Sequence, residues 1–244
     1  MNEYFIYVRD EVKFSCAEAE SKFNSIQPSA IVHPDAILGQ RCFHWSFLHC
    51  WTFCKIGKCL PIIPWGAVVG DDLPGLTVIG NNNIIGHHAV MGIKCQDMKY
   101  KPGNECFLEI GDNNEIREYT SVHRSSHPNE RTVIGDKNLI MGSCHIAHDC
   151  KVGNNNIFAN NTLLAGHVTV EDYTRTAGAT VIHQFCYIGS FSFIGGGSVI
   201  KSLRAAYIKI FMPSDGIFRS IEERLSELEK DEELGQVPVV RMMI

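Results

Sequence analysis

The stretch "IGDKNLIMGSCHIAHDCKVGNNNIF", residues 134–158, carries a large apolar residue at every sixth position. The same step continues to residue 200, and only Thr176 is not large and apolar among Ile134, Ile140, Ile146, Val152, Phe158, Leu164, Val170, Thr176, Ile182, Ile188, Ile194 and Ile200. Two shorter series precede it, Ile79, Ile85, Met91 and Ile110, Ile116, Val122. A period of six fits neither a helix face, at about 3.6 residues, nor strand alternation, at about two.

This period is typical of a hexapeptide parallel β-helix, in which each hexad forms one short strand and one corner. Three hexads close a triangular coil, and the apolar residues point inward as one continuous column. An ordinary β-sandwich would need the spacing to hold by chance over all these steps. The sequence therefore predicts an all-β fold in which residue i lies beside residue i+18, about 4.8 Å away in the next coil.

Three domains follow from this pattern. We expect an N-terminal extension over 1–27, the β-helix over 28–200, and a truncated helical domain over 201–244. Loops at 93–106 and 124–131 interrupt the repeat, and such interruptions on a solenoid are binding loops or tolerated insertions. Apolar residues at helical spacing predict two helices, over 201–212 and 217–234.

The segment 41–65 breaks the repeat in another way. It holds five potential zinc ligands, Cys42, His44, His49, Cys50 and Cys54, but their spacing matches no standard zinc pattern. The glycines expected at 45 and 51 are both Trp, whose only codon is TGG, and reading one nucleotide later turns both into Gly. We therefore interpret 41–65 as out-of-frame or scrambled repeat sequence and give these ligands no functional role.

The composition limits the class of protein. A net charge of -5 argues against non-specific binding to nucleic acid, and no apolar run reaches the roughly 18 residues of a membrane span. The 10 cysteines form no CxxC pair, which favours a reducing compartment. The first 25 residues are too rich in acid to resemble an organelle transit peptide.

The densest polar cluster lies in "MGSCHIAHDC", residues 141–150. The offset of eighteen places Gly166 on His148 and His167 on Asp149, so these four residues are expected to be neighbours. A His beside an Asp is a general-base pair, and a Gly N–H beside it can stabilise an oxyanion. The arrangement suits acyl transfer to a hydroxyl group without a covalent enzyme intermediate. Zinc bound by three histidines is the rival interpretation.

Several motifs give the chain a family resemblance: "QDMKY" at 96–100, "NEIREYTSVHR" at 114–124, "HIAHDC" at 145–150, "ANNTLLAGH" at 159–167 and "HQFC" at 183–186. The chain resembles the acyl-carrier-protein–UDP-N-acetylglucosamine O-acyltransferases of lipid A synthesis, and "GDDLPG" resembles their plant mitochondrial branch. The resemblance implies a homotrimer of left-handed β-helices that acts on UDP-N-acetylglucosamine, with acyl carrier protein as acyl donor. It implies no metal or other cofactor, and a mitochondrial location with the cytoplasm as the alternative.

The resemblance also implies roles for single residues. His148 would be the general base, Asp149 its partner, and the Gly166 amide would face the thioester oxygen. The remaining assignments are Asp97, His145 and His167 for the sugar, Lys99 for phosphate, His183 and Gln184 for the nucleotide side, and Gly196 for acyl-chain length. From its residues alone, the loop at 93–106 offers Gln96 and Asp97 for sugar hydroxyls and Lys99 for a phosphate, with a solvated loop as the alternative.

The chain departs from the family after Ile200, where "GGGSVI" runs directly into "KSLRAAY" without the family's connecting loop and first helix. Those segments carry part of the nucleotide and carrier-protein site. A trimer-forming scaffold without turnover is therefore a second hypothesis, and a zinc enzyme like the γ-carbonic anhydrases is a third.

Overall fold

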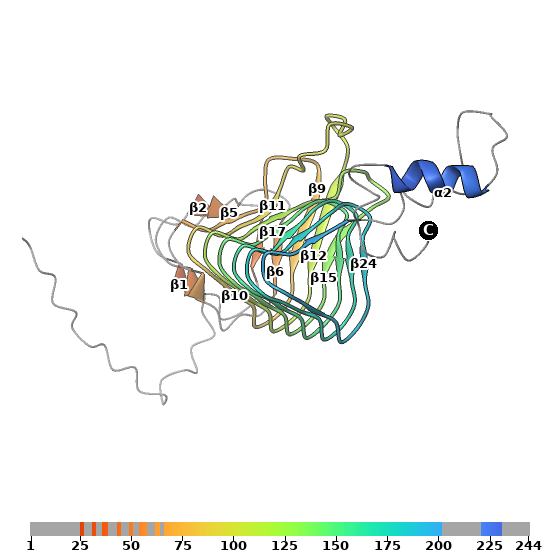
Figure 1. Cartoon of the computed structure of the whole chain (residues 1–244). Helices are drawn as coiled ribbons and strands as arrows, with labels where there is room; N and C mark the ends of the chain where they lie inside the picture. Colours follow the sequence, from red (N-terminus) through yellow and green to blue (C-terminus); the bar gives the residue numbers. More distant parts are fainter. Residues whose placement is uncertain are drawn as a thin grey trace, which may run out of the picture.

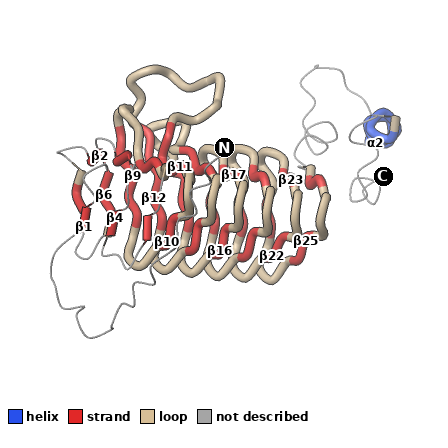
Figure 2. The backbone as a smooth tube through the Cα atoms, turned by 90° about the vertical axis from the view of Figure 1, so that its left-hand side faces the viewer, coloured by secondary structure: helices blue, strands red, loops and turns tan. Residues whose placement is uncertain are grey.

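A computed structural model describes residues 25–26, 31–32, 36–38, 43–44, 49–50, 54–57, 62–63, 66–201 and 221–230. The chain winds into stacked three-sided coils with short strands on each side (Figure 1). One long loop rises away from the coils near β11 and β12, and the coils otherwise repeat evenly along the stack (Figure 2). The predicted parallel β-helix is therefore present.

The strands form parallel sheets along the sides of the stack. The nine-stranded sheet holds β2 Ile31–Val32, β5 His49–Cys50, β8 Val68–Val69, β11 Val90–Ile93, β14 Ser121–His123, β17 His145–Ile146, β20 Leu163–Leu164, β23 Val181–Ile182 and β26 Val199–Ile200. The eight-stranded sheet holds β3 Ile37–Leu38, β6 Cys54–Ile56, β9 Gly75–Ile79, β12 Cys106–Ile110, β15 Thr132–Ile134, β18 Lys151–Val152, β21 Thr169–Val170 and β24 Tyr187–Ile188.

The six-stranded sheet holds β10 Ile84–Ile85, β13 Glu115–Ile116, β16 Leu139–Ile140, β19 Ile157–Phe158, β22 Arg175–Thr176 and β25 Phe193–Ile194. A three-stranded sheet holds β1 Ser25–Ile26, β4 Phe43–His44 and β7 Ile62–Ile63. A helix, α2, spans Ile221–Glu229.

The predicted offset of eighteen residues is confirmed wherever the repeat is unbroken, as in the pairing of Ile134 with Val152. It grows to 24 across the loop at 124–131 and to 31 across the loop at 93–106, because the extra residues leave the coil and return to the same side. The loops thus add length while the coils stay stacked, and the pairing of β11 with β14 shifts its register between Met91 and Ile93, next to the loop at 93–106.

The apolar column forms the core. The residues of the long series are buried from Ile134 to Ile182, and Ile188 and Ile200 near the end of the stack are half-buried. Thr176 is buried too, and its hydroxyl pairs with that of Thr162 at 2.7 Å. That hydrogen bond explains how the one polar member is tolerated inside the column.

A column of buried asparagines lines a corner of successive coils, and consists of Asn83, Asn114, Asn138 and Asn156. Each side-chain oxygen accepts the backbone N–H of the corresponding residue one coil further on, at 2.7 to 2.8 Å. The amide of Asn138 also donates to the Gly153 carbonyl at 2.9 Å. These bonds satisfy corner groups that the sheets leave unpaired.

Towards both ends, the chain follows the expected domains only in part. β1 lies at Ser25–Ile26, so the coil begins before the boundary expected at residue 28. The segment 41–65 contributes strands β4 to β7 to the sheets, and its out-of-frame origin stays a prediction. The helix α2 falls inside the expected 217–234, whereas the helix expected at 201–212 lies outside the described residues. Within the described part of the chain, no helix is long and apolar enough to span a membrane.

The asparagine column predicts a stability effect. Asn138→Ala leaves the buried Asn156 N–H and the Gly153 carbonyl without partners, which should cost about 2–4 kcal/mol of unfolding free energy. The measurement is denaturant unfolding followed by circular dichroism. Asn129→Ala, at an exposed position, is the control and should stay within about 0.5 kcal/mol of the parent. Equal effects of the two changes would refute the role of the column.

Candidate active site

The candidate site lies where successive coils turn from the nine-stranded to the eight-stranded sheet. His148 and Asp149 occupy this turn between β17 and β18, and Gly166 and His167 occupy the same turn one coil further on. Backbone hydrogen bonds stack the turns, because the His167 N–H donates to the His148 carbonyl at 3.0 Å. The four residues predicted to be neighbours are therefore brought together.

His148 and Asp149 form a buried hydrogen-bonded pair, with 2.8 Å between His148 Nδ1 and Asp149 Oδ2. Asp149 has a φ of 61°, a left-handed conformation that Asp tolerates better than most residues. This conformation accompanies the bond between two side chains that are adjacent in sequence. Because Nδ1 is engaged with the carboxylate, the other nitrogen of the ring, Nε2, is left to meet a substrate.

Two residues that the sequence analysis missed hold Asp149 in place. The Ser126 hydroxyl donates to Asp149 Oδ2 at 2.6 Å, and the Ser126 N–H donates to Oδ1 at 3.1 Å. The Asp149 N–H in turn donates to Thr132 Oγ1 at 2.9 Å. Ser126 lies in the loop at 124–131, which breaks the period of six, so the eighteen-residue offset could not place it.

The surroundings keep the carboxylate charged. Burial alone would raise the pKa of Asp149, but hydrogen bonds from His148 and Ser126 outweigh it and lower the pKa below its ordinary value. An ionised Asp149 can stabilise a protonated His148, which is what a general base needs after it takes a proton.

Two further histidines, His145 in the cavity lining described below and the buried His123, lie near this pair. Ser121 Oγ lies 2.7 Å from His145 Nδ1, and the His145 and His123 rings meet edge to face with centroids 4.7 Å apart. Burial lowers the pKa of His145, with His148 adding to the effect, and burial lowers that of His123 to about 4. Both rings are therefore neutral near pH 7. Ser121 and His123 were also missed, because each looks like an ordinary strand residue in the sequence.

Gly166 leaves room for the His148 ring. A Cβ at Gly166 would lie 2.6 Å from His148 Nε2, closer than real Cβ contacts, so any side chain would displace the imidazole. In the stretch 66–201, the Gly166 N–H has no hydrogen-bond acceptor. It is therefore available to an oxygen of a bound substrate.

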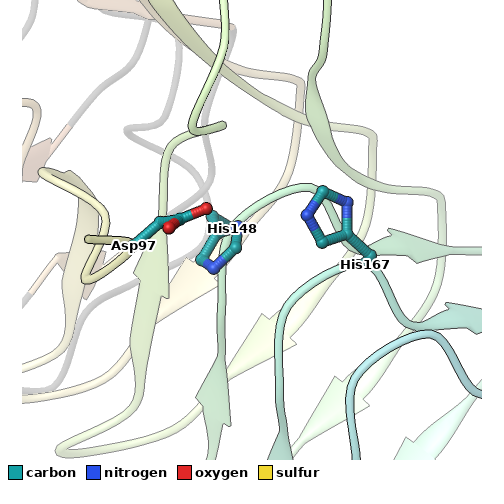
Figure 3. Close-up of side chains that lie close together, drawn as sticks. All are labelled: Asp97, His148 and His167. Atoms are coloured by element: carbon teal, nitrogen blue, oxygen red, sulfur yellow. The ribbon is translucent and has the colours of Figure 1, made fainter. Parts of the chain in front are cut away.

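Asp97 reaches the same place from the loop at 93–106. One ligating atom each of Asp97, His148 and His167 lies within 4.8 Å of the others, and the three side chains converge in Figure 3. His167 stacks on Phe185, with ring centroids 4.7 Å apart and an interplanar angle of 6°. The rival hypothesis required three histidines, whereas the group found in the described residues has two histidines and one carboxylate.

A cavity of about 290 Å³ opens beside His148. Its lining comprises Gln96, His145, Ala147, His148, Leu163, Leu164, Ala165, Gly166, Val181 and Gln184. The polar residues gather near His148, and Leu163 and Val181 supply an apolar floor from the outer face of the nine-stranded sheet. A polar head and an apolar tail could therefore bind side by side.

Six predicted site residues lie outside this lining. Asp97, Asp149 and His167 are near His148 as described above, and the other three are Lys99, His183 and Gly196. The Lys99 side chain is exposed, although its N–H donates to Asp97 Oδ1 at 2.8 Å and so orients that carboxylate. His183 is exposed next to Gln184. Gly196 lies on the turn between β25 and β26, a different corner of the triangle from His148.

The cysteine next to the His148–Asp149 pair is not suited to act as a nucleophile. Cys150 follows Asp149 in sequence, but it is buried and its thiol contacts the Ala165 carbonyl at 3.1 Å. Burial raises the pKa of Cys150 to about 12, so the thiolate is negligible near pH 7. The geometry thus favours direct general-base chemistry.

The hydrogen bonds of Ser126 predict a pH-dependent effect. Ser126→Ala should raise the pKa of Asp149 towards its ordinary value and lower stability near pH 7 by about 1–3 kcal/mol. The native pKa of Asp149 is depressed, so its contribution to stability is complete above about pH 4 and is lost as the pH falls through the native pKa. The difference from the parent should therefore shrink in acid. Denaturant unfolding of both chains from neutral to acidic pH measures this difference. Ser126→Thr is the control, because it keeps the hydroxyl and should behave like the parent. A difference in stability that does not change with pH would refute the role of Ser126.

The chain is similar to proteins of one family. Residues 131–166 match the family description "Bacterial transferase hexapeptide (six repeats)". The chain is 53% identical over 218 residues to the protein of Arabidopsis thaliana named "Probable acyl-[acyl-carrier-protein]--UDP-N-acetylglucosamine O-acyltransferase, mitochondrial", covering 75% of this chain and 65% of the relative.

Two solved structures extend the match. Arabidopsis UDP-N-acetylglucosamine acyltransferase shares 52% identity with a TM-score of 0.66, covering 89% of this chain and 94% of that one. The Campylobacter jejuni enzyme of the same name shares 30% identity with a TM-score of 0.61, covering 90% and 94%. The predicted left-handed handedness of the β-helix is confirmed by this likeness.

The chain spans only part of its curated relatives, 65% of the Arabidopsis protein and 46% of one from Synechocystis. The solved Arabidopsis structure, by contrast, is covered almost completely. With that coverage, 52% identity and the same coil, the chain belongs to the acyl-[acyl-carrier-protein]–UDP-N-acetylglucosamine O-acyltransferase family of hexapeptide-repeat proteins.

Proposed function

We propose that this chain transfers an (R)-3-hydroxyacyl group from acyl carrier protein to the 3-hydroxyl of UDP-N-acetylglucosamine, the first step of lipid A biosynthesis. The single observation that carries the proposal is the buried His148–Asp149 pair beside the vacant Gly166 N–H. Family membership supports these substrates, and the geometry supports a mechanism in which His148 acts without a metal or other cofactor.

His148 is the general base in this mechanism. Its Nε2 takes the proton of the sugar 3-hydroxyl as the oxygen attacks the thioester carbonyl, and Asp149 stabilises the imidazolium that forms. The tetrahedral intermediate places its negative oxygen at the Gly166 N–H. When it collapses, the bond from carbon to sulfur breaks, and the proton on His148 passes to the carrier thiolate.

The sugar and nucleotide occupy the polar side of the cavity. The carboxylate of Asp97 and the side chains of Gln96, His145 and His167 offer partners for the sugar hydroxyls and its amide. His183 and Gln184 lie one coil further on and serve the nucleotide, and Lys99 on the loop serves a phosphate. In this arrangement the diphosphate would lie between the loop at 93–106 and the later coils.

The acyl chain follows the outer face of the nine-stranded sheet. Leu163, Val181 and Val199 succeed one another on that face at one-coil intervals, and Leu163 and Val199 are 39% and 59% exposed. Gly196 lies on the far corner beside β26, where an absent side chain extends the path. The strip therefore runs from the His148 side of the triangle towards Gly196.

We propose that the assembly is a homotrimer in which this strip is covered by a neighbouring subunit. Large apolar side chains remain exposed on the last coils, among them Phe191 at 78% and Phe193 at 74%. The cellular compartment is a separate proposal. The Arabidopsis relative is named mitochondrial, and we propose the same compartment for this chain. Microscopy of the complete gene product fused to a fluorescent protein would test it.

The second candidate is a trimeric scaffold without turnover. The alignment with the Arabidopsis relative runs over 218 positions yet uses 75% of this 244-residue chain, so part of the matched relative has no counterpart here. The jump after Ile200 is the sequence feature that fits such a gap. This candidate predicts assembly with no acyl transfer by the parent chain, a result that would remove the enzymatic proposal.

The general-base assignment is tested by His148→Ala. Acyl transfer should fall by about 10²–10⁴-fold, because the sugar hydroxyl is no longer deprotonated during attack. The measurement is turnover of UDP-N-acetylglucosamine with a 3-hydroxyacyl carrier protein. His88→Ala is the matched control, since His88 is exposed and stacks on Tyr119 at another corner. Full activity of His148→Ala in an intact assembly would refute the assignment of His148 as general base.

The role of Gly196 is tested by Gly196→Met. A side chain there should shorten the acyl path, so the ratio of rates with long and short 3-hydroxyacyl donors should fall by about 10-fold or more. Gly195→Met is the control, because a Cβ at Gly195 meets only Ser198 Oγ, at 3.8 Å. An unchanged ratio in Gly196→Met would show that the chain ends elsewhere.

A further inference from the structure

We propose that Asp97, His148 and His167 form a binding site for a divalent transition-metal ion of the Zn²⁺ class, and that the bound ion switches the active site off. The ligating atoms of these residues lie within 4.8 Å of one another. His148 is buried, and Asp97 and His167 are half-buried. Two imidazoles and one carboxylate that leave a coordination position open are a ligand set that zinc accepts.

Each of the three side chains is oriented by a second contact. His148 Nδ1 bonds to Asp149 Oδ2 at 2.8 Å, which turns Nε2 outward. The Lys99 N–H donates to Asp97 Oδ1 at 2.8 Å, and the stack on Phe185 fixes the plane of the His167 ring. A carboxylate behind a ligating histidine and a donor behind a ligating carboxylate are the outer contacts usual in metal sites.

The charge of the site also favours a cation. Asp97 and Asp149 place two carboxylates around the rings, with 3.7 Å between Asp149 Oδ2 and His167 Nε2. Ligands bound to zinc at about 2.0–2.2 Å lie closer together than 4.8 Å, so the site must contract on binding. Asp97 stands on the loop at 93–106, whose Met98 side chain is fully exposed, and this loop can supply the movement.

A bound ion would occupy the lone pair of His148 Nε2 that removes the proton of the sugar hydroxyl. It would also occupy the carboxylate of Asp97, the proposed partner of the sugar. Metal and UDP-N-acetylglucosamine should therefore exclude each other, and inhibition should be competitive with the sugar nucleotide. This consequence for turnover rests on the proposed function, whereas binding of the ion does not.

The test is titration of the complete, chelator-treated chain with Co²⁺, followed by visible absorption, and then displacement with Zn²⁺. We expect a ligand-field spectrum of one Co²⁺ per chain without the near-ultraviolet band of thiolate ligands. Asp97→Asn and His167→Gln should each weaken the affinity by about 10-fold or more, and His88→Ala should not change it. UDP-N-acetylglucosamine should compete with Co²⁺ for the parent chain.

Three results would overturn the inference: no Co²⁺ spectrum, a thiolate band that marks cysteine ligands instead, or unchanged affinity in both Asp97→Asn and His167→Gln. Zn²⁺ that binds and raises acyl transfer would also overturn it, because the ion would then assist the base. Failure of Co²⁺ to bind leaves the acyltransferase proposal intact. Conversely, full activity of His148→Ala would refute the assignment of His148 as general base, but it would not change the Co²⁺ spectrum of the parent chain.

Discussion

The structure depends on one constraint: each triangular coil must stack on the next with its backbone hydrogen bonds in register. The active-site corner is built by these bonds, since the His167 N–H donates to the His148 carbonyl and the Phe185 N–H donates to the Gly166 carbonyl. Residues eighteen positions apart are thereby held as neighbours. A site assembled in this way is as rigid as the solenoid itself, which is the condition for a preorganised general base.

The same constraint determines which residue types fit at the corner. Coils this close leave no space over the His148 ring, so position 166 must lack a side chain. Asp149 adopts a left-handed conformation and bonds to the adjacent His148. Ser126, which lies outside the repeat, donates a further hydrogen bond to the Asp149 carboxylate. Stacking supplies the base and the vacant N–H, and the loop supplies the group that keeps the carboxylate charged.

This division explains what the sequence could predict. The period of six predicted the fold, the inward column and the contact of His148 and Asp149 with Gly166 and His167, because a strict repeat turns sequence distance into spatial distance. Ser126 and the approach of Asp97 to the two histidines could not be derived from the period, since the loops shift the offset to 24 and 31. The residues of the loop offered Asp97 as a partner for sugar hydroxyls, and the family resemblance assigned it to the site. That resemblance did not show that Gly196 stands at another corner from the base.

The features that suit His148 to its proposed role as a base also suit it to its proposed role as a metal ligand. A carboxylate on Nδ1 raises the electron density at Nε2, and that nitrogen can then accept a proton from a hydroxyl or coordinate a cation. Asp97 has two corresponding proposed roles, as an acceptor for sugar hydroxyls or as an anionic ligand. What separates the two outcomes is the position of the loop at 93–106. In the two proposals, a sugar nucleotide would fill the space between Asp97 and the rings, whereas an ion would need that space to close.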